Sequence, residues 1–433
     1  MDSKRSLSRR DFLKGAAAAG AAVVFPVVVP SSVLGRDGSV APGNRIVMGA
    51  VGTGGMGTGN MKGFLGSAEV QMVAVCDVDK KRRDDAKKAV DDKYKNSDCM
   101  AYGDFRELLA RKDLDAITTA TPDHWHAMVA VAAAKAGLDI YGEKPLARSI
   151  REGRAICDAV HRCGRVWQTG SWQRSQEKFR RAAELVRNGR IGKVTRVEVG
   201  LPTGKGGGSE QPGQPIPDGL DYDMWLGPAP YAPYSKDRLH YQWRWILDYS
   251  GGQLTDWCGH HVDIAHWGLG FDYTGPCEIE GKATYPTTGL YNTPTEYKFT
   301  CKYAGGVEVV VANNKQIPMG TKWIGEKGSV YIDRGAPVTT EPKSIAKDVI
   351  GPGEIRLYDS RDHKRNFLDC VRSRQLTIAP VEVAQRSISV GLLGEIAMLM
   401  GRKIKWDPVK EEIIGDPGAG ALLGRSYREP WHL

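Results

Sequence analysis

A glycine-rich turn directly after an apolar run constrains the fold of this chain more than any other feature. Residues Arg45–Val51 predict a buried strand, and a helix that extends to about Leu65 follows the turn. Glycines permit a tight turn and let backbone N–H groups approach a pyrophosphate at the helix N-terminus. The pattern predicts the first strand and helix of a dinucleotide-binding domain. Its expected cofactor-binding residues are Gly52, Thr53, Gly54, Gly55, Met56 and Gly57.

An acidic residue at the end of the next predicted strand indicates which dinucleotide binds. Val70–Cys76 reads as that strand, and Asp77 follows it. A carboxylate there can accept hydrogen bonds from the adenosine ribose hydroxyls and would repel a 2′-phosphate, so NAD is favoured over NADP. Two alternatives stay open. Asp77 could merely cap a helix, and Arg82 or Arg83 could hold a 2′-phosphate.

The strand and helix alternation continues through the next segment. Asp104–Ala110 predicts a helix, Asp115–Ala120 a strand and Ala127–Ala136 a helix. The connection before the last helix reads Thr121-Pro122-Asp123-His124-Trp125-His126. We expect Thr121 and Pro122 to place backbone atoms against the cofactor. His124 and His126 are candidates for the same site, although each could instead cap the helix or pack.

A charged pair then follows the short predicted strand Leu138–Tyr141. Glu143 and Lys144 precede Pro145, whose ring fixes φ and hence the direction of the chain. Ligands of open α/β sheets bind at the carboxyl ends of the strands, so both charged residues are site candidates. The alternative is a surface salt bridge at a strand end.

The first residues predict export. Ser8-Arg9-Arg10-Asp11-Phe12-Leu13-Lys14 precedes the apolar run Gly15–Val29, which is the pattern of a twin-arginine signal within residues 1–35. Pro26 interrupts the run, and a membrane span takes about 20 residues. We therefore expect the twin-arginine machinery to deliver the protein to the periplasm or another extracytoplasmic space, with no membrane span in the mature protein. An uncleaved anchor is the alternative.

Length and composition limit what the rest can be. A chain of 433 residues can form two full cores, and we place a Rossmann domain at 44–168 and a second domain at 169–433. The net charge of +9 is modest and the basic residues are interspersed with acidic ones, so nucleic-acid binding is not expected. The eight cysteines form no Cys-x-x-Cys pair, which disfavours zinc ribbons and thioredoxin-like chemistry.

The pattern changes in the second domain. A predicted helix, Ser175–Asn188, and a strand, Val194–Gly200, lead into a glycine- and proline-rich loop, Pro202–Gly219. Tyr222–Tyr249 is dense in aromatic residues, which either stack on sugar rings or only pin a loop into the core. The chain then predicts an open, mainly antiparallel sheet, two helices (His363–Ser373 and Val381–Met400) and an irregular tail from Trp406. The expected strands are Pro276–Tyr285, Thr295–Tyr303, Gly306–Ala312, Thr321–Ile324 and Ser329–Ile332.

Asp256 and His260 are the candidate acid–base pair of the second domain. They are four residues apart and would share one helical face, where a carboxylate can orient an imidazole. A metal site built from Asp256, His260, His261 and His266 is disfavoured, because His260 and His261 point about 100° apart on a helix. Candidate substrate contacts are Trp172, Arg174, Tyr241, Arg244, Trp245 and His261.

Four motifs in register identify a family resemblance. The turn Gly52–Gly57, the segment Cys76-Asp77-Val78-Asp79, the segment Thr121–His126 and Glu143-Lys144-Pro145 together resemble the Gfo/Idh/MocA oxidoreductases. The resemblance implies an α/β protein with an N-terminal Rossmann domain and a C-terminal α+β domain. The large open sheet of the second domain would form a homo-oligomer, a dimer or tetramer, through its outer face.

The same resemblance implies roles for three residues. Lys144 would contact the nicotinamide ribose and the reacting hydroxyl, His260 would take the hydroxyl proton, and Asp256 would hold His260 or the substrate. The expected function is an exported NAD-dependent oxidoreductase with tightly bound cofactor, acting on a secondary hydroxyl of a sugar, glycoside or cyclic polyol.

Two other functions are weighed against this one. The first is a redox-neutral NAD-dependent glycosidase. Residues His240–Tyr249 resemble such glycosidases, whereas Asp256-Trp257-Cys258 is closer to the dehydrogenases. The second is a cofactor-binding scaffold without activity, which has no need of Lys144 or His260.

Overall fold

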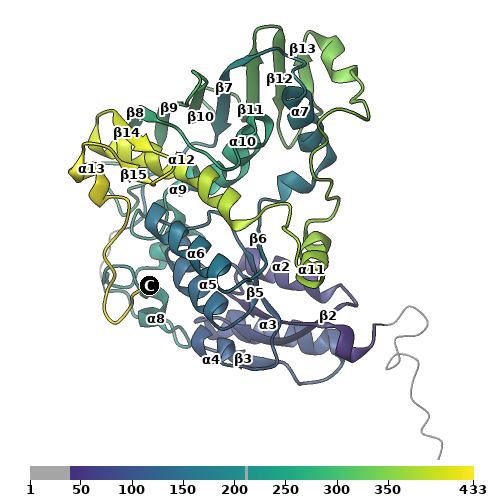
Figure 1. Cartoon of the computed structure of the whole chain (residues 1–433). Coiled ribbons are helices and arrows are strands. Elements are labelled where there is room, and N and C mark those ends of the chain that lie inside the picture. Colours follow the sequence, from purple (N-terminus) through teal and green to yellow (C-terminus); the bar gives the residue numbers. More distant parts are fainter. Residues whose placement is uncertain (1–39, 210–212) are drawn as a thin grey trace, which may run out of the picture. The chain divides into compact units, whose positions relative to one another are not determined.

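The computed structural model describes residues 40–209 and 213–433 (Figure 1). The predicted signal region therefore lies outside the described residues. Two sheets, joined by the segment after β6, organise the chain from Ile46 onward. The predicted fold class, a Rossmann domain followed by an α+β domain with a mainly antiparallel sheet, is confirmed.

The first sheet is parallel and has the order β3-β2-β1-β4-β5-β6. Helices connect its strands, and the order reverses between β1 and β4, which is where such sheets open a crevice for a ligand. Its elements are β1 (Ile46–Val51), α2 (Gly55–Leu65), β2 (Val70–Cys76), α3 (Lys80–Tyr94), β3 (Met100–Tyr102), α4 (Phe105–Leu109), β4 (Ala116–Thr119), η2 (Asp123–Trp125), α5 (His126–Lys135), β5 (Asp139–Gly142), α6 (Ile150–Arg162) and β6 (Trp167–Thr169).

Local sequence explains where these helices begin. Asp79 caps α3 by accepting hydrogen bonds from the backbone N–H groups of Lys81 and Arg82, and Asp104 caps α4 in the same way. Ser149 caps α6 and lies three residues before Glu152, the spacing of a capping box. The strands between them are nearly continuous runs of buried residues, as expected for a sheet covered on both faces.

The second sheet is mixed, with nine strands in the order β13-β12-β11-β7-β10-β9-β8-β14-β15. Only β7 and β10 pair in parallel. Its strands are β7 (Val194–Leu201), β8 (Glu278–Thr284), β9 (Glu296–Lys302), β10 (Glu308–Asn313), β11 (Gly320–Gly325), β12 (Gly328–Ile332), β13 (Thr339–Glu341), β14 (Ile404–Asp407) and β15 (Glu412–Ile413). Residues of β8 and β9 alternate, with Ile279 and Phe299 buried and Lys282 and Lys298 exposed, so one face of the sheet carries the core.

Helices cover the core face of this sheet. α7 packs on β12, α10 on β11 and α12 on β8 and β9. They and the neighbouring helices are α7 (Glu177–Arg187), α8 (Tyr222–Leu226), α9 (Gly252–Trp257), the π-helical turn η6 (Cys258–Val262), α10 (Asp263–Leu269), α11 (His363–Ser373), α12 (Val381–Met400) and α13 (Pro417–Ala421). Of the described helices, α12 alone is long and apolar enough to cross a membrane by length and composition, and most of it is buried in this core.

The tail differs from the irregular segment that the sequence predicts. β14 and β15 form a hairpin that extends the second sheet beside β8, and α13 follows. Ile404 and Trp406 point inward and are almost fully buried, while Lys405 is exposed. An alternation this short carries too little periodicity to be read as a strand.

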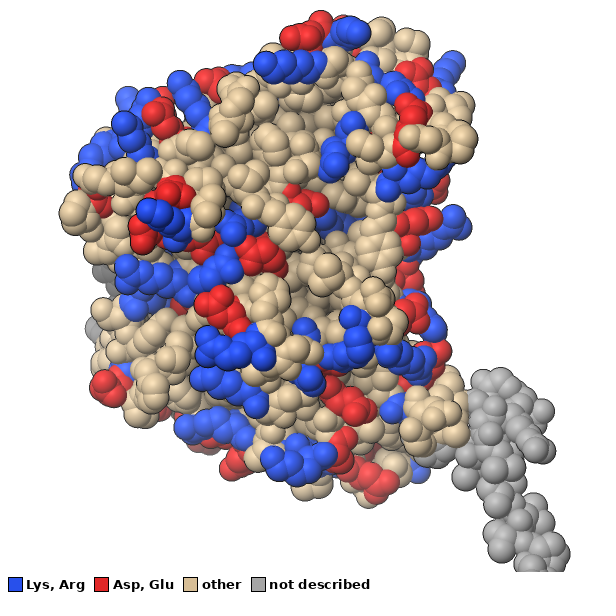
Figure 2. Space-filling model, in the orientation of Figure 1, with Lys and Arg blue, Asp and Glu red and all other residues tan. Residues whose placement is uncertain are grey.

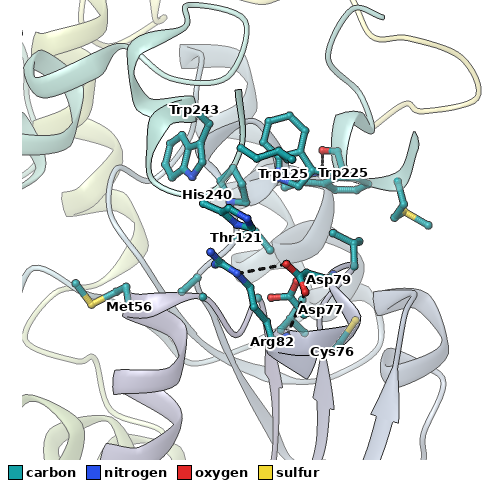
Figure 3. A pocket seen from close by; sticks show the side chains of 18 of the residues that line it. Met56, Cys76, Asp77, Asp79, Arg82, Thr121, Trp125, Trp225, His240 and Trp243 are labelled. Atoms are coloured by element: carbon teal, nitrogen blue, oxygen red, sulfur yellow. Dashed lines mark hydrogen bonds and ion pairs between the residues drawn. The ribbon is translucent and has the colours of Figure 1, made fainter. Parts of the chain in front are cut away.

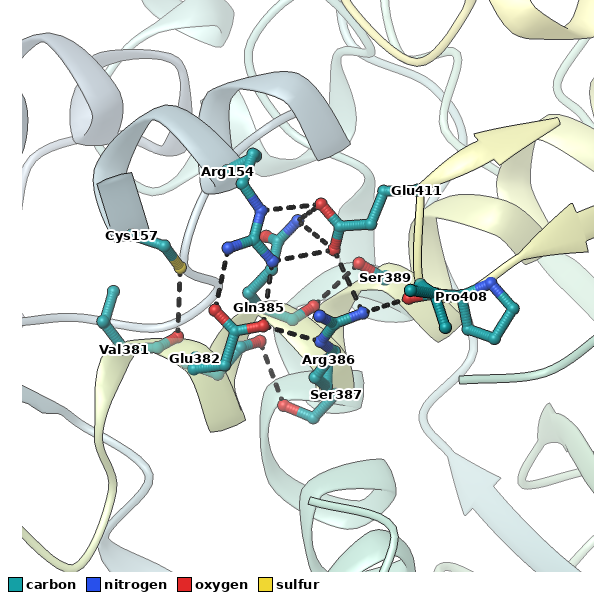
Figure 4. Close-up of polar contacts among 12 residues, drawn as sticks. Arg154, Cys157, Val381, Glu382, Gln385, Arg386, Ser387, Ser389, Pro408 and Glu411 are labelled. Carbon is teal, nitrogen blue, oxygen red and sulfur yellow. Dashed lines mark hydrogen bonds and ion pairs between the residues drawn. The ribbon is translucent and has the colours of Figure 1, made fainter. Parts of the chain in front are cut away.

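A partly buried network of charges ties the tail to both domains (Figure 4). Arg154 on α6 forms two-pronged hydrogen bonds with Glu382 on α12 and with Glu411 in the β14–β15 turn. Arg386 also bonds Glu382, and Gln385 reaches Glu411. Two-pronged pairs of an arginine and a carboxylate hold the two side chains in one orientation and also stabilise the fold. The network therefore helps to set how α6 packs on α12.

The surface shows no block of one charge on the face drawn in Figure 2, where basic and acidic side chains are interspersed. All eight cysteines are unpaired, and six of them are buried. Burial raises the pKa of the Cys99 thiol to about 11.

Candidate functional site

A cavity of about 490 Å³ opens at the carboxyl ends of β1, β2 and β4 (Figure 3). The glycine turn, Asp77 and Thr121 line one side, and the aromatic-rich segment of the second domain lines the other. This position is the crevice at the point where the strand order reverses. The residues that line the cavity include Gly52, Gly54, Gly55, Met56, Asp77, Asp79, Arg82, Thr121, Pro122, Trp125, Leu220, Trp225, His240, Tyr241, Trp243 and Arg244.

The glycine turn fits a dinucleotide closely. Gly52 has a φ of +77°, and a Cβ there would lie 2.9 Å from the backbone of Ala120. A Cβ on Gly57 would lie 1.7 Å from the carbonyl oxygen of Gly52, so glycine is required for α2 to approach β1. Gly54 at the N-cap offers no capping side chain, which leaves the first N–H groups of α2 for a ligand. Such a helix start binds pyrophosphate.

Asp77 is held at the edge of the cavity by two backbone hydrogen bonds. Its Oδ2 accepts a hydrogen bond from the Thr53 N–H at 2.7 Å, and its Oδ1 accepts one from the Asp79 N–H at 2.9 Å. Burial raises the pKa of Asp77, and these two hydrogen bonds oppose the rise. The carboxylate therefore stays fixed at the end of β2, with lone pairs left to accept ribose hydroxyls.

The two neighbouring arginines have different surroundings. Arg82 lies in the cavity, where its Nη1 stands 2.5 Å from the position of a Cβ on Gly54 and its Nε is 3.7 Å from Asp79 (Figure 3). Arg83 donates a hydrogen bond to the carbonyl of Asp77 and does not line the cavity. Of these two arginines, Arg82 is thus the one that lines the cavity.

A segment of the second domain covers the cavity, and we call Leu220–Arg244 the cover segment. Leu220 forms a β-bridge with Asp79, and the backbone N–H groups of Lys80 and Asp221 donate hydrogen bonds across the same junction. His240 and Trp243 face Arg82 across the opening (Figure 3). Residues that the sequence separates widely therefore enclose one cavity.

Three predicted cofactor residues support this cavity from outside it. His124 is fully buried with its Nε2 3.1 Å from the carbonyl of Trp225. The ring of His126 bridges the carbonyls of Thr121 and Pro145, at 2.9 and 2.7 Å. Glu143 accepts a hydrogen bond from Asn60 at 2.8 Å. Thr121 and Pro122, by contrast, line the cavity as the sequence predicts for them.

Lys144 meets the second domain at Asp256. Its Nζ donates a 2.7 Å hydrogen bond to Asp256 Oδ1, and Arg244 Nε lies 3.7 Å from the same oxygen. Burial alone would raise the pKa of Asp256, but the charges of Lys144 and Arg244 hold it below its ordinary value. The pair is therefore ionised and joins the two domains beside the cavity.

The helix that carries Asp256 and His260 is not regular. Asp256 lies in α9 and His260 in the π-helical turn η6, which inserts between α9 and α10. His260 Nδ1 is buried and has no hydrogen-bond partner among the described residues, while Asp256 bonds Lys144. Burial, followed by the charges of Lys144 and Arg334, holds the pKa of His260 well below its ordinary value.

An aromatic box surrounds His260. The edges of Trp172 and Trp257 meet the imidazole at ring-centroid distances of 6.2 and 5.6 Å. The same two indoles stack on the guanidinium of Arg334, at 4.5 and 4.3 Å. Arg334 comes from the turn after β12 and carries no sequence signal, because only the packing of the sheet on α9 brings it to His260.

The remaining predicted substrate residues separate into two groups. Tyr241 and Arg244 line the cavity, and Arg244 stacks on Tyr241 at 4.5 Å. Arg174 is instead buried in ion pairs with Asp263 and Asp272. The other two serve packing: Trp245 is buried and bonds Gln242, and His261 is buried and stacks on Trp257. Within residues 40–209 and 213–433, no group of three or more His, Cys, Asp or Glu side chains is placed to hold a metal ion.

Comparison with protein families covers almost the whole chain. Residues 46–171 match the model described as "Oxidoreductase family, NAD-binding Rossmann fold", and residues 177–433 match "Oxidoreductase family, C-terminal alpha/beta domain" of the Gfo/Idh/MocA group. Residues 6–26 match the twin-arginine translocation signal sequence.

Individual relatives are more distant. The scyllo-inositol 2-dehydrogenase (NAD(+)) of Bacillus subtilis (strain 168) is 23% identical over 317 residues, which cover 71% of this chain and 82% of that protein. A glycosyl hydrolase family 109 protein of Solibacter usitatus (strain Ellin6076) is 35% identical over 150 residues, 34% of each protein. The structure of GenD2 from gentamicin A biosynthesis in complex with NAD aligns with a TM-score of 0.61 and 20% identity, over 84% of this chain and 97% of that one.

Proposed function

Because the chain belongs to the Gfo/Idh/MocA oxidoreductase family and carries its NAD-binding domain, we propose that it oxidises a secondary hydroxyl of a sugar, glycoside or cyclic polyol. The observation that carries the proposal is the contact of Lys144 with Asp256 beside a neutral, unpartnered His260. A scaffold that only bound NAD would have no use for this arrangement.

Each of the three residues has a distinct role. NAD, when bound, accepts a hydride from the carbon that carries the hydroxyl. His260 accepts the hydroxyl proton, because a neutral imidazole has a free lone pair. The Lys144 ammonium stabilises the negative charge that develops on the oxygen, and Asp256 orients that ammonium at 2.7 Å.

The export signal and the covered cavity are consistent with a cofactor that stays bound. Residues 6–26 match a twin-arginine signal, and the twin-arginine route moves folded proteins. NAD is scarce outside the cytoplasm, so a released cofactor would be lost. The cover segment contacts the connection between β2 and α3 at the mouth of the cavity, where it would slow release. We propose that the reduced cofactor is reoxidised in place by a second carbonyl compound in the periplasm or an equivalent space.

A redox-neutral glycosidase is the second candidate. The 35% identity to a glycosyl hydrolase family 109 protein favours it, although that match covers only a third of either chain. Such a reaction would also begin by oxidation, and would then need a base to remove the proton next to the new carbonyl. Asp256 is hydrogen-bonded to Lys144 and is therefore not free to act as this base, which favours net oxidation.

Product formation over time separates the two reactions. We expect the purified holoenzyme, given a nitrophenyl glycoside and no acceptor, to make one keto product per enzyme and then stop. A second carbonyl sugar should restart it. Mass spectrometry of the products and nitrophenol absorbance give the measurement. Continuous release of nitrophenol over many turnovers, with no keto sugar, would establish the glycosidase instead.

The pH profile tests the role of His260. The imidazole must be neutral to accept a proton, and its pKa lies well below the ordinary 6.5. We therefore expect the rate of reduction of bound NAD, measured by stopped-flow absorbance, to stay level as the pH falls from 8 through 6.5 and to decline only below that value. An acid limb centred at or above pH 6.5 would contradict this assignment.

A further inference from the structure

Arg334 holds unused hydrogen-bonding capacity beside the reacting groups. Its Nε and Nη2 are both shielded from solvent, and neither has a hydrogen-bond acceptor among the described residues. These two nitrogens lie on one edge of the guanidinium and point their N–H groups the same way. That edge is the one that arginine uses to bind a carboxylate in two-pronged fashion.

Because the two indoles stack on Arg334, only the in-plane Nε and Nη2 edge of its guanidinium is left to bind an acceptor. Trp172 and Trp257 stack on the guanidinium at 4.5 and 4.3 Å, so its faces are occupied. Hydrogen bonds can form only in the plane of the group. Removing a cation from water without giving it a hydrogen-bond acceptor costs free energy, and buried polar groups in proteins normally have hydrogen-bond partners. A ligand that enters the site would supply the missing acceptor.

The backbone under Arg334 is firmly anchored. Lys178 on α7 donates hydrogen bonds to the carbonyl oxygens of Asp333, Arg334 and Ala336, with Nζ 3.0 Å from the first and 3.2 Å from the last. The turn after β12 therefore presents the side chain from a fixed point. Arg334 itself is only partly buried, although its Nε and Nη2 are shielded, so a ligand reaches that edge by displacing the groups that cover it.

Positive charge exceeds negative charge around this point. The cations Lys144, Arg244 and Arg334 all act on Asp256 and lower its pKa. Asp333 is the other carboxylate that acts on Arg334, and it also lies 3.7 Å from the ring of His261. Burial lowers the pKa of Arg334, and the two carboxylates only partly oppose this effect. The site is therefore suited to a ligand that brings a negative charge.

We propose that the substrate is an anionic sugar, a glycuronide or sugar acid, whose carboxylate binds the Nε and Nη2 edge of Arg334 between Trp172 and Trp257. This inference rests on the proposed function, since it names the substrate class of the same site. Trp172, which is only partly buried, then adds an apolar aromatic surface of the kind that packs against sugar rings. Arg334 is a specificity residue in this arrangement, while His260 and Lys144 act on the hydroxyl.

Binding to the reduced holoenzyme tests the proposal without requiring turnover. NADH-loaded protein cannot oxidise a sugar, so calorimetric titration with methyl glucuronide and with the matching methyl glucoside compares binding alone. We expect the glucuronide to bind roughly 10–100-fold more tightly, the usual effect of a hydrogen bond to a charged group. Equal affinities would overturn the proposal. Tighter binding of glucose 6-phosphate than of the glucuronide would contradict the carboxylate assignment.

Variants separate recognition from a structural role. Arg334→Met should remove the preference for the glucuronide and leave glucoside affinity within about threefold, whereas Arg334→Lys, which keeps the charge but not the two-pronged edge, should retain part of it. Arg106→Met, which removes an exposed arginine stacked on Trp431, is the matched control and should change neither affinity. Equal weakening of both ligands by Arg334→Lys would show that the residue only supports the fold.

The substrate class and the oxidoreductase activity can fail separately. If the glucoside reduces bound NAD as readily as the glucuronide does, the substrate is not an anionic sugar, but the protein is still an oxidoreductase. If the glucuronide binds tightly through Arg334 but never reduces NAD, the binding site is correct and the oxidoreductase activity is not.

Discussion

Replacement of Lys144 by alanine is expected to lower the rate of reduction of bound NAD by a factor of about 10²–10⁴. The change removes the only charge that is hydrogen-bonded to Asp256 in the described structure, and it removes the ammonium that stabilises the developing oxyanion. Lys144→Arg keeps a positive charge but not its position, so it should recover only part of the rate. Single-turnover absorbance of the reduced cofactor gives the measurement.

Two controls make the result specific to the chemistry. The NAD content of the Lys144→Ala protein should equal that of the parent, because the glycine turn and Asp77 are unchanged. Lys410→Ala, at an exposed position in the tail, should have no effect on the rate. A Lys144→Ala protein that keeps its cofactor and works within threefold of the parent would remove Lys144 from the mechanism.

Replacement of Arg174 by methionine is expected to destabilise the protein by about 3–5 kcal/mol, because it leaves buried carboxylates without their counter-charge. Arg174 is 3% exposed and pairs with Asp263 and Asp272 at 2.7 Å each. It also stacks on Trp267. Denaturant unfolding measures the loss. Since Arg174 lies among these partners and not in the cavity, the KM of the folded variant for sugar should stay within about twofold of the parent.

The double variant Arg174→Met, Asp263→Leu provides the control. Apolar replacement of both members of a buried pair is often nearly neutral, so part of the lost stability should return. A raised KM with unchanged stability in Arg174→Met would instead support the role in substrate binding that the sequence suggests for Arg174.

The parts of the site that the sequence predicts are those with local signals. The turn at Gly52–Gly57 needs glycine for steric reasons, Asp77 follows directly after a strand, and both lie at the cavity. Arg334 is different. Its meeting with Trp172 and Trp257 depends on the register of a sheet and on the packing of α9, which no local pattern encodes.

Departures from regular structure were also beyond the sequence. The spacing of Asp256 and His260 predicts a helix, but it does not predict that the turn holding His260, η6, is π-helical. Gly259 in that turn lies against Lys144, since a Cβ there would come within 3.1 Å of the lysine Cβ. This approach joins residues that are far apart in the sequence, and no local pattern encodes it.

The junction of the cover segment with the β2–α3 connection has a consequence for how the protein is made. One wall of the cavity lies within residues 51–129, but the other wall lies at residues 220–244. More than half of the chain must therefore leave the ribosome before the cavity can enclose NAD. In the proposed export route, NAD is then loaded in the cytoplasm, after these residues have folded and before translocation.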